Sequence, residues 1–382
     1  MQKRYCRLSV VVALGIISAP SFATNGDQML GVSATQWGMA GAHTAAPQDA
    51  ATVLTNPAGL ADLSMQEFRA DFGFGVLNPP RKANGIESGS DYYLMPAGAL
   101  AYRPNEKITF GMGMAGLSGM GVDFPDTMPN IAGNQAIVTT KQFYKIAPGV
   151  GYKVNEKLSL GAAFNIDYQS LALSNPMFHL PQNQVYGYGA TFGLTFKPNP
   201  KLTLGASYTT KQSMNEFKWN TTAGAYSVTM DAPPILSLGV AFKPMPDLLV
   251  EVDVKHIAFS DVLDQIDFNT PGGQTKMKFG WSDQTVLAIG VQKKLNPKTT
   301  VRAGFNYGKS PIGPEDVDSN IGSLAVTEKH LTLGVTRQMG QRMFTSLSYA
   351  RAFHNEVTSN SGSGNKIELE QNVVNLQMSY VF

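Results

Sequence analysis

A short turn between two strand-like segments recurs along this chain and limits its fold more than any other feature. Each copy has an aromatic or aliphatic residue, a basic residue, a tight turn and then an alternating run, as in AYRPNEKITFG and TFKPNPKLTLG. Six copies lie 44 to 51 residues apart, centred on Asn105, Asn155, Asn199, Met245, Asn296 and Gly340. Six short turns between hairpins require seven hairpins, so the repeat predicts fourteen antiparallel strands.

The alternation within these runs assigns two faces to each strand. Leu202 and Leu204 point to one side, whereas Thr203 and Gly205 point to the other, and the last run alternates in the same way up to the C-terminal Phe382. A soluble β-sandwich also alternates, but a chain of this length would bury both sheets and need no aromatic girdle beside its turns.

The composition favours a membrane barrel over a soluble fold. Hydrophobic residues make up 43% of the chain and charged residues only 15%, against about 25% charged in soluble domains. After the first 23 residues, no apolar run approaches the roughly 18 residues of a membrane helix. We therefore predict an all-β fold, a 14-stranded antiparallel transmembrane β-barrel formed by residues 67–382.

The first residues read as a secretory signal. Lys3, Arg4 and Arg7 precede an apolar run over 8–19, and Ser-Phe-Ala at 21–23 ends it, so residues 1–23 form the predicted signal peptide. The chain's single cysteine, Cys6, lies within it, so we expect no disulfide and no soft metal site in the exported protein. No cofactor is implied, and a net charge of +2 without a basic run gives no indication of nucleic-acid binding.

Residues 24–66 lack the alternation of a membrane strand and are rich in small side chains. A flexible linker or a short periplasmic domain would have the same composition. However, the run GMAGAHTAAPQDAATVLTNPAGLADL, with Asn56, Pro57 and Ala58, resembles the N-terminal hatch of the FadL/TodX family of outer-membrane transporters for hydrophobic compounds. The resemblance extends to the signal peptide, the strand count and the C-terminal Phe382.

The resemblance implies a monomeric barrel plugged by the hatch in the outer membrane of a Gram-negative bacterium. Its partners would be a hydrophobic small molecule, the barrel assembly machinery, and the surrounding outer-membrane lipid and lipopolysaccharide. It further implies that substrate is captured at the external loops, passes to a pocket beside the hatch and leaves sideways where the third strand kinks inward.

The third predicted strand contains the glycine-rich stretch KITFGMGMAGLSGMG. Its GxGxxG string matches a dinucleotide-binding motif, but no helix follows it, as that motif requires. Glycine weakens strand pairing and often marks a bend, so we expect a lateral exit at Gly111, Gly113, Gly116, Gly119 and Gly121. The alternative is that these glycines only allow close packing against the hatch.

Two further groups of residues are candidates for substrate contact. Apolar side chains in external loops are expected to capture substrate, or else to cap the barrel mouth by packing together: Leu171, Leu173, Met177, Phe178, Leu180, Met214, Phe217 and Trp219. Four inward cations are candidate partners for a substrate carboxylate: Arg69, Lys211, Lys255 and Arg302. Inward acids such as Asp71 and Asp253 favour internal salt bridges instead.

We therefore predict passive uptake of hydrophobic compounds, with long-chain fatty acids favoured and aromatic or aliphatic hydrocarbons as the alternative. A barrel enzyme such as a lipid hydrolase is a second alternative, although the five histidines show no HExxH spacing and no GxSxG occurs. A general porin is disfavoured by the hatch. We expect no enzymatic activity and no catalytic residues.

Overall fold

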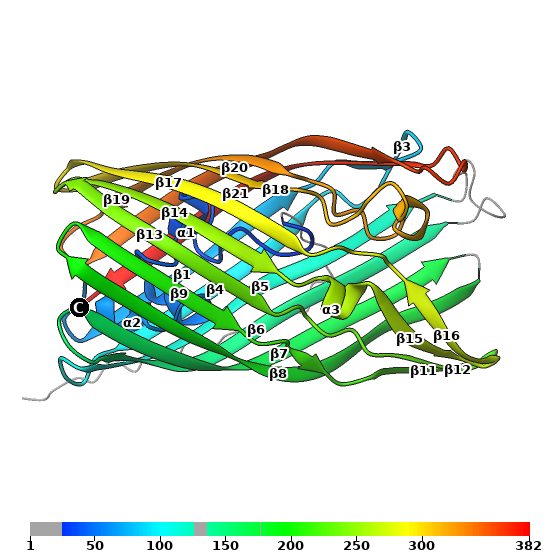
Figure 1. Cartoon of the computed structure of the whole chain (residues 1–382), viewed down its shortest axis with the longest axis horizontal. Helices are drawn as coiled ribbons and strands as arrows, with labels where there is room; N and C mark the ends of the chain where they lie inside the picture. Colours follow the sequence, from blue (N-terminus) through cyan, green and yellow to red (C-terminus); the bar gives the residue numbers. More distant parts are fainter. Residues whose placement is uncertain (1–24, 126–135, 176) are drawn as a thin grey trace, which may run out of the picture.

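The computed structural model describes residues 25–125, 136–175 and 177–382, so the predicted signal peptide and Thr24 lie outside the described residues. Fourteen long strands, each paired with its neighbours in an antiparallel ladder, form a closed barrel (Figure 1). They are β1 (Phe68–Asn78), β4 (Tyr93–Tyr102), β5 (Ile108–Phe124), β6 (Ile137–Lys153), β7 (Leu158–Asn175), β8 (Phe178–Asn199), β9 (Leu202–Thr209), β13 (Ile235–Met245), β14 (Leu248–Ile257), β17 (Gln284–Asn296), β18 (Thr299–Gly308), β19 (Lys329–Gln338), β20 (Met343–Thr358) and β21 (Lys366–Val381). Pairing of β21 with β1 closes the ring, which confirms the predicted fold class.

All six predicted turns join consecutive barrel strands at one end of the molecule (Figure 1). The Asn105 side-chain oxygen accepts hydrogen bonds from the amides of Lys107 and Ile108, both at 3.0 Å. Asn155, Asn199 and Asn296 each accept the amide two residues onward in the same way. Asparagine thus closes these turns through its own side chain, which explains its recurrence. Short turns of this kind mark the periplasmic end of such barrels.

The opposite end carries the longer loops and several small elements. β2 (Arg81–Ala83) and β3 (Ile86–Glu87) extend the wall, and β10 (Ser213–Met214) pairs with β8. A separate four-stranded sheet contains β11 (Phe217–Thr221), β12 (Gly224–Val228), β15 (Gln265–Thr270) and β16 (Gly273–Lys278). The short helices α3 (Ser260–Leu263) and η3 (Val317–Ser319) complete this region. No helix in the described part of the chain is long and apolar enough to cross a membrane.

The N-terminal segment lies inside the barrel and is almost completely buried (Figure 1). It contains α1 (Ala34–Gly38), the 3-10 helix η1 (Ala50–Leu54) and α2 (Gly59–Asp62). Ser33 caps α1 by accepting the Gln36 amide, and Asp49 caps η1 by accepting the Ala51 amide. We call residues 25–66 the hatch; the first barrel strand follows at Phe68.

Glycines of the barrel wall make room for the hatch. At eleven inward positions on nine strands, an added Cβ would lie within 3.0 Å of a hatch atom: Gly111, Gly113, Gly149, Gly151, Gly161, Gly193, Gly205, Gly239, Gly290, Gly304 and Gly334. Several are direct cross-strand partners, such as Gly161 with Gly193 and Gly205 with Gly239. We call this set the glycine belt. The hatch backbone can approach the wall closely only because these positions lack side chains.

Carboxylates of β14 hold the hatch backbone. Asp253 accepts the amides of His43 and Thr44, both at 2.9 Å, and Glu251 accepts those of Ala45 and Ala46 at 2.7 and 3.0 Å. These amides lie outside any helix and would otherwise be buried without partners.

The Asn-Pro-Ala step docks against β6, β7 and β8. Asn56 donates from its amide nitrogen to the Thr44 carbonyl within the hatch at 2.7 Å and to the Leu194 carbonyl of β8 at 3.3 Å. Its side-chain oxygen accepts the Ala58 amide at 3.2 Å, which closes the turn around Pro57. The motif thus contacts the wall directly, and its role as an anchor of the hatch stays a prediction.

Gly161→Ala tests the glycine belt. The added methyl would meet Pro57 and Ala58 backbone atoms at less than 3.0 Å. Neither the turn nor the strand can yield easily, so we expect a loss of about 1–3 kcal/mol in unfolding free energy and greater protease access to the hatch. Gly272→Ala is the control, since its nearest atom is 3.8 Å away. Equal thermal unfolding of both variants and the wild type would contradict the close fit.

Candidate functional site

Cavities lie on both sides of the hatch, and a large one opens toward the external loops. It has a volume of about 860 Å³ and a mainly apolar lining. Leu171, Leu173, Met177 and Phe178, four of the eight predicted loop residues, line it. Met177 is 81% exposed, as expected for a side chain available to a ligand at the mouth.

The other four predicted loop residues serve a different purpose. Leu180, Met214, Phe217 and Trp219 are buried in the core of the extracellular region, where the Phe217 and Trp219 rings stack with centroids 5.6 Å apart. Trp219 donates from its ring nitrogen to the Pro181 carbonyl at 2.7 Å. The structure therefore places these four in the packing that caps the barrel mouth, the alternative weighed from the sequence.

Sequence reasoning missed two aromatic residues of the external cavity. Tyr226 of β12 and Phe268 of β15 line it together with Phe178, and the three ring centroids lie 5.5 to 6.1 Å apart. Aromatic faces at these distances form a favourable surface for apolar ligands. Tyr226 and Phe268 are on the separate extracellular sheet, whose position relative to β8 cannot be read from strand alternation.

A smaller chamber lies between the hatch and the wall, with a volume of about 80 Å³. Its apolar lining includes Leu30, Val32 and Phe143. Two lysines, Lys145 of β6 and Lys255 of β14, also line it. Among the described residues, neither lysine has a carboxylate oxygen within 4.0 Å. Asp167 lies directly opposite Lys145 in the β6–β7 register but beyond that distance.

The four predicted inward cations have different partners. Arg69 forms a buried ion pair with Asp71 at 2.8 Å, and Lys211 pairs with Asp231 at 3.0 Å. Arg302 instead donates to the Gln48 side-chain oxygen and to Thr336, and it faces a polar cavity of about 620 Å³ below the hatch. Of the four, only Lys255 lines the chamber beside the hatch. Lys145 was missed, although its alternation with Ala147 and Gly149 places it inward.

The hydrogen-bonded ladder between β4 and β5 ends partway along the wall, and we call this gap in the ladder the opening. Their ladder ends at the pair Ala97 and Ala115, and the next pair would be Pro96 with Gly116. Proline has no amide hydrogen and glycine favours irregular strands, so the ladder stops there. The β5–β6 register shifts between Gly116 and Ser118, as in a β-bulge. A cavity of about 30 Å³ lies at this point, lined by residues of both the hatch and the wall.

The hatch replaces β4 as the partner of β5 beyond the opening. Met29 donates its amide to the Leu117 carbonyl at 3.0 Å, and Gly119 donates to the Asp27 carbonyl at 3.2 Å. The buried Asp27 carboxylate also accepts from Lys141 at 2.8 Å and from Ser118 at 2.6 Å. The first hatch residues thus form the inner side of the opening.

The five predicted exit glycines do not share one environment. Gly111 and Gly113 belong to the glycine belt and face Leu60, Val53 and Leu54 of the hatch, as the packing alternative requires. Gly116 lines the opening at the register shift. Gly119 and Gly121 lie in the bent part of β5, opposite Gln142 and Thr140 of β6. Their role in an exit remains a prediction.

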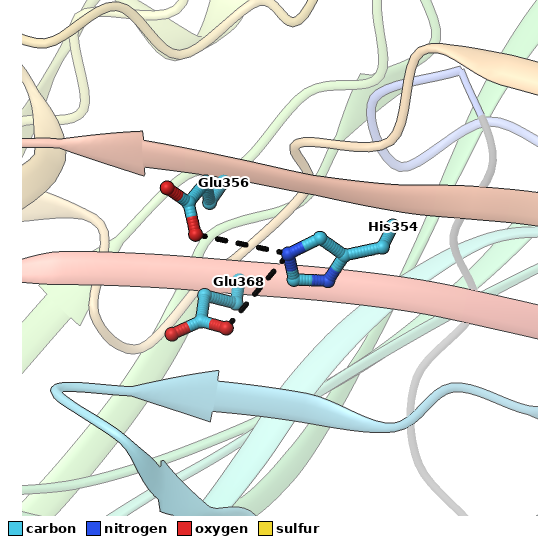
Figure 2. A group of neighbouring side chains, drawn as sticks. All are labelled: His354, Glu356 and Glu368. Carbon is cyan, nitrogen blue, oxygen red and sulfur yellow. Dashed lines mark ion pairs between the residues drawn. The ribbon is translucent and has the colours of Figure 1, made fainter.

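A histidine and two glutamates meet on the outer face of β20 and β21, near the external end (Figure 2). His354 lies 3.7 Å from Glu356 and 3.9 Å from Glu368, which is opposite Glu356 in the register. Lys366 already pairs with both glutamates, at 3.2 and 2.8 Å. Its ammonium group offsets part of the negative charge of the facing carboxylates, so this group is an ion-pair cluster at the surface.

Asp318 ties two external loops together. Its carboxylate accepts hydrogen bonds from Ser359, Ser361, Ser363 and Asn365, at 2.6 to 2.9 Å. These donors favour the charged form and lower the Asp318 pKa from 3.8 to about 2. Asp318 also lines the external cavity, so this network fixes one of its walls.

Comparison with known proteins gives one consistent result. The family model described as outer membrane protein transport protein (OMPP1/FadL/TodX) matches residues 15–380. Among solved structures, a Pseudomonas aeruginosa FadL homologue has a TM-score of 0.78 at 17% identity, covering 94% of this chain and 100% of its own. The P. putida toluene transporter TodX has a TM-score of 0.76 at 19% identity, covering 92% and 99%. The Ralstonia pickettii toluene transporter TbuX has a TM-score of 0.74 at 19% identity, covering 92% and 98%. No curated protein sequence matches the chain.

The Asp318 network should be sensitive to acid. Because the folded-state pKa lies below the unfolded value of 3.8, its stabilising effect is present above pH 3.8 and is lost as the pH falls toward about 2. We expect hydrogen exchange in residues 359–365, corrected for intrinsic rates, to accelerate over this range. In Asp318→Asn the segment should exchange rapidly at every pH, whereas the control Asp267→Asn should behave as wild type. A pH-independent wild type would refute the prediction.

Proposed function

The chain belongs to the OMPP1/FadL/TodX family of outer-membrane transport proteins, and from this premise we propose that it takes up long-chain fatty acids by passive diffusion. The family consists of outer-membrane β-barrel proteins of Gram-negative bacteria that transport hydrophobic compounds. In our proposal the external cavity captures the acid, the chamber beside the hatch binds it, and the opening at Gly116 releases it into the membrane.

The pair Lys145 and Lys255 is the observation that carries this proposal. Both line a largely apolar chamber, and no carboxylate among the described residues lies within 4.0 Å of either ammonium. A cation removed from water without a partner is costly, and a charged hydrogen bond to a carboxylate offsets that cost. A fatty acid supplies the carboxylate, and the part of its alkyl chain next to the carboxylate contacts the apolar lining of the chamber.

The driving force needs no energy source. Each Å² of apolar surface that leaves water contributes roughly 25 cal/mol, so entry of the alkyl chain into the bilayer is favourable. The barrier is the polar layer outside the membrane. A plugged barrel with an opening in its wall passes this layer without forming a water channel, and Asp253 and Glu251 hold the hatch in place meanwhile.

Aromatic hydrocarbons are the second candidate substrate. The Phe178, Tyr226 and Phe268 rings of the external cavity suit a flat apolar ligand, and two of the similar structures are toluene transporters. A hydrocarbon, however, offers nothing to the two lysines of the inner chamber. The lysines therefore separate the two candidates experimentally.

The double variant Lys145→Gln with Lys255→Gln tests the carboxylate site. We expect the rate of oleate uptake to fall about tenfold or more, the loss of a charged hydrogen bond. Toluene entry should stay close to the wild-type rate. Uptake is measured in cells without another copy of the transporter, with Lys211→Gln as control, because Lys211 pairs with Asp231 away from the chamber.

The outcomes separate the candidates clearly. Unchanged oleate uptake in the double variant would refute a carboxylate site in the inner chamber. An equal fall for oleate and toluene would show that the lysines support the barrel structure. Wild-type uptake of toluene but not of oleate would favour the hydrocarbon alternative.

A further inference from the structure

Tyr144 of β6 occupies an unusual position beside the wall opening. The alternation of β6 assigns its side chain to the outer face, since Lys145 and Ala147 are buried in the interior, whereas Ile146 is 41% exposed. Its direct partner on β5 is Gly116, the residue at which the β4–β5 ladder has just ended. Gly116 has no side chain of its own that could separate the neighbouring ring from the β5 backbone.

The Tyr144 ring contacts the barrel interior at this position. It packs against a buried cluster that includes Met29 of the hatch and Tyr93 and Met95 of β4, all of which face inward. A side chain on the outer face of a closed wall cannot reach an interior cluster. The contact is therefore made across the gap between β4 and β5, where Pro96 and Gly116 leave the ladder unpaired.

The tyrosine ladder on the outer surface supports this placement. Tyr144, Tyr168 and Tyr186 are direct partners on β6, β7 and β8, with ring centroids 6.3 and 5.7 Å apart. Tyr186 is 56% exposed on the barrel surface, whereas Tyr168 and Tyr144, nearer the opening, are partly buried. The row of rings thus runs along the outer wall and ends in the gap.

We propose that Tyr144 is the outer gate of the lateral exit and limits the width of the molecules that pass. The proposal rests on the proposed function, for which it identifies a specificity-determining residue. The hatch residues Asp27 to Met29 form the inner side of the opening, and the Tyr144 ring covers its outer side. A slender alkyl chain needs only a small displacement of the ring. A wider molecule must displace the ring completely from its contacts with the interior cluster.

Uptake of two fatty acids of different width tests the gate. The probes are palmitate and a fatty acid with a terminal pyrene group, given to cells without another copy of the transporter. In Tyr144→Ala we expect entry of the pyrene acid to rise several-fold relative to palmitate, and in Tyr144→Trp we expect the ratio to fall. Tyr168→Ala is the matched control, because Tyr168 belongs to the same ladder but lies away from the gap.

Chemical modification provides a test that does not depend on folding of the variants. The only cysteine is Cys6, in the predicted signal peptide, so one introduced thiol can be modified selectively in the folded protein. A bulky maleimide on Tyr144→Cys should abolish entry of both probes, whereas the same reagent on Tyr168→Cys should leave entry unchanged.

The results distinguish failure of the gate from failure of the proposed function. If wild-type cells take up neither probe faster than cells lacking the protein, the proposed function is wrong. The proposal that Tyr144 is a gate is then refuted as well. If the wild type transports but Tyr144→Ala keeps the wild-type ratio, or loses both probes equally, the gate alone is refuted. Unchanged entry after modification of Tyr144→Cys also refutes it.

Discussion

The close fit of the hatch against the barrel wall determines how the interior of this protein is arranged. A buried segment without regular secondary structure leaves amides unpaired, and here Asp253 and Glu251 reach inward to accept four of them. The wall can approach this backbone because the glycine belt removes the intervening side chains. A barrel with ordinary inward residues would either exclude the hatch or hold it too far away for these bonds. Hatch residues line both the inner chamber and the cavity at the opening, so the position of the hatch sets the shape of both.

The same contacts explain how one strand serves both the plug and the opening. Along β5, Gly111 and Gly113 pack against the hatch, and three residues later Gly116 borders the gap. Between them the ladder with β4 ends, because Pro96 and Gly116 would be the next pair. Met29 and Asp27 then take over the hydrogen bonds of the bent strand. The first residues of the hatch border both the opening and the lysine-lined chamber. The position of the hatch therefore affects both.

The sequence predicted the barrel well because its signals are local. An asparagine that closes its own turn and a side-chain period of two both act within a few residues, so the strand count and all six turns were predicted correctly. The site was predicted only in part, because its contacts join distant segments. Asp27 pairs with Lys141, and Phe217 and Trp219 form a core with other loops. The alternation of inward and outward side chains placed Arg302 and Lys255 inward. It did not show that Arg302 binds Gln48 while Lys255 faces the chamber. Register shifts, such as the one after Gly116, also interrupt the alternation of side chains at the position of the opening.

A crystal structure of the protein with bound oleate would show whether the chamber beside the hatch binds the fatty acid. We expect the carboxylate within hydrogen-bond distance of Lys145 or Lys255, with the alkyl chain directed past the hatch toward Gly116 and Tyr144. The hatch should retain its bonds to Asp253 and Glu251. Oleate bound with its carboxylate at Arg302, in the cavity below a displaced hatch, would contradict the account, because that position belongs to a route through the barrel to the periplasm.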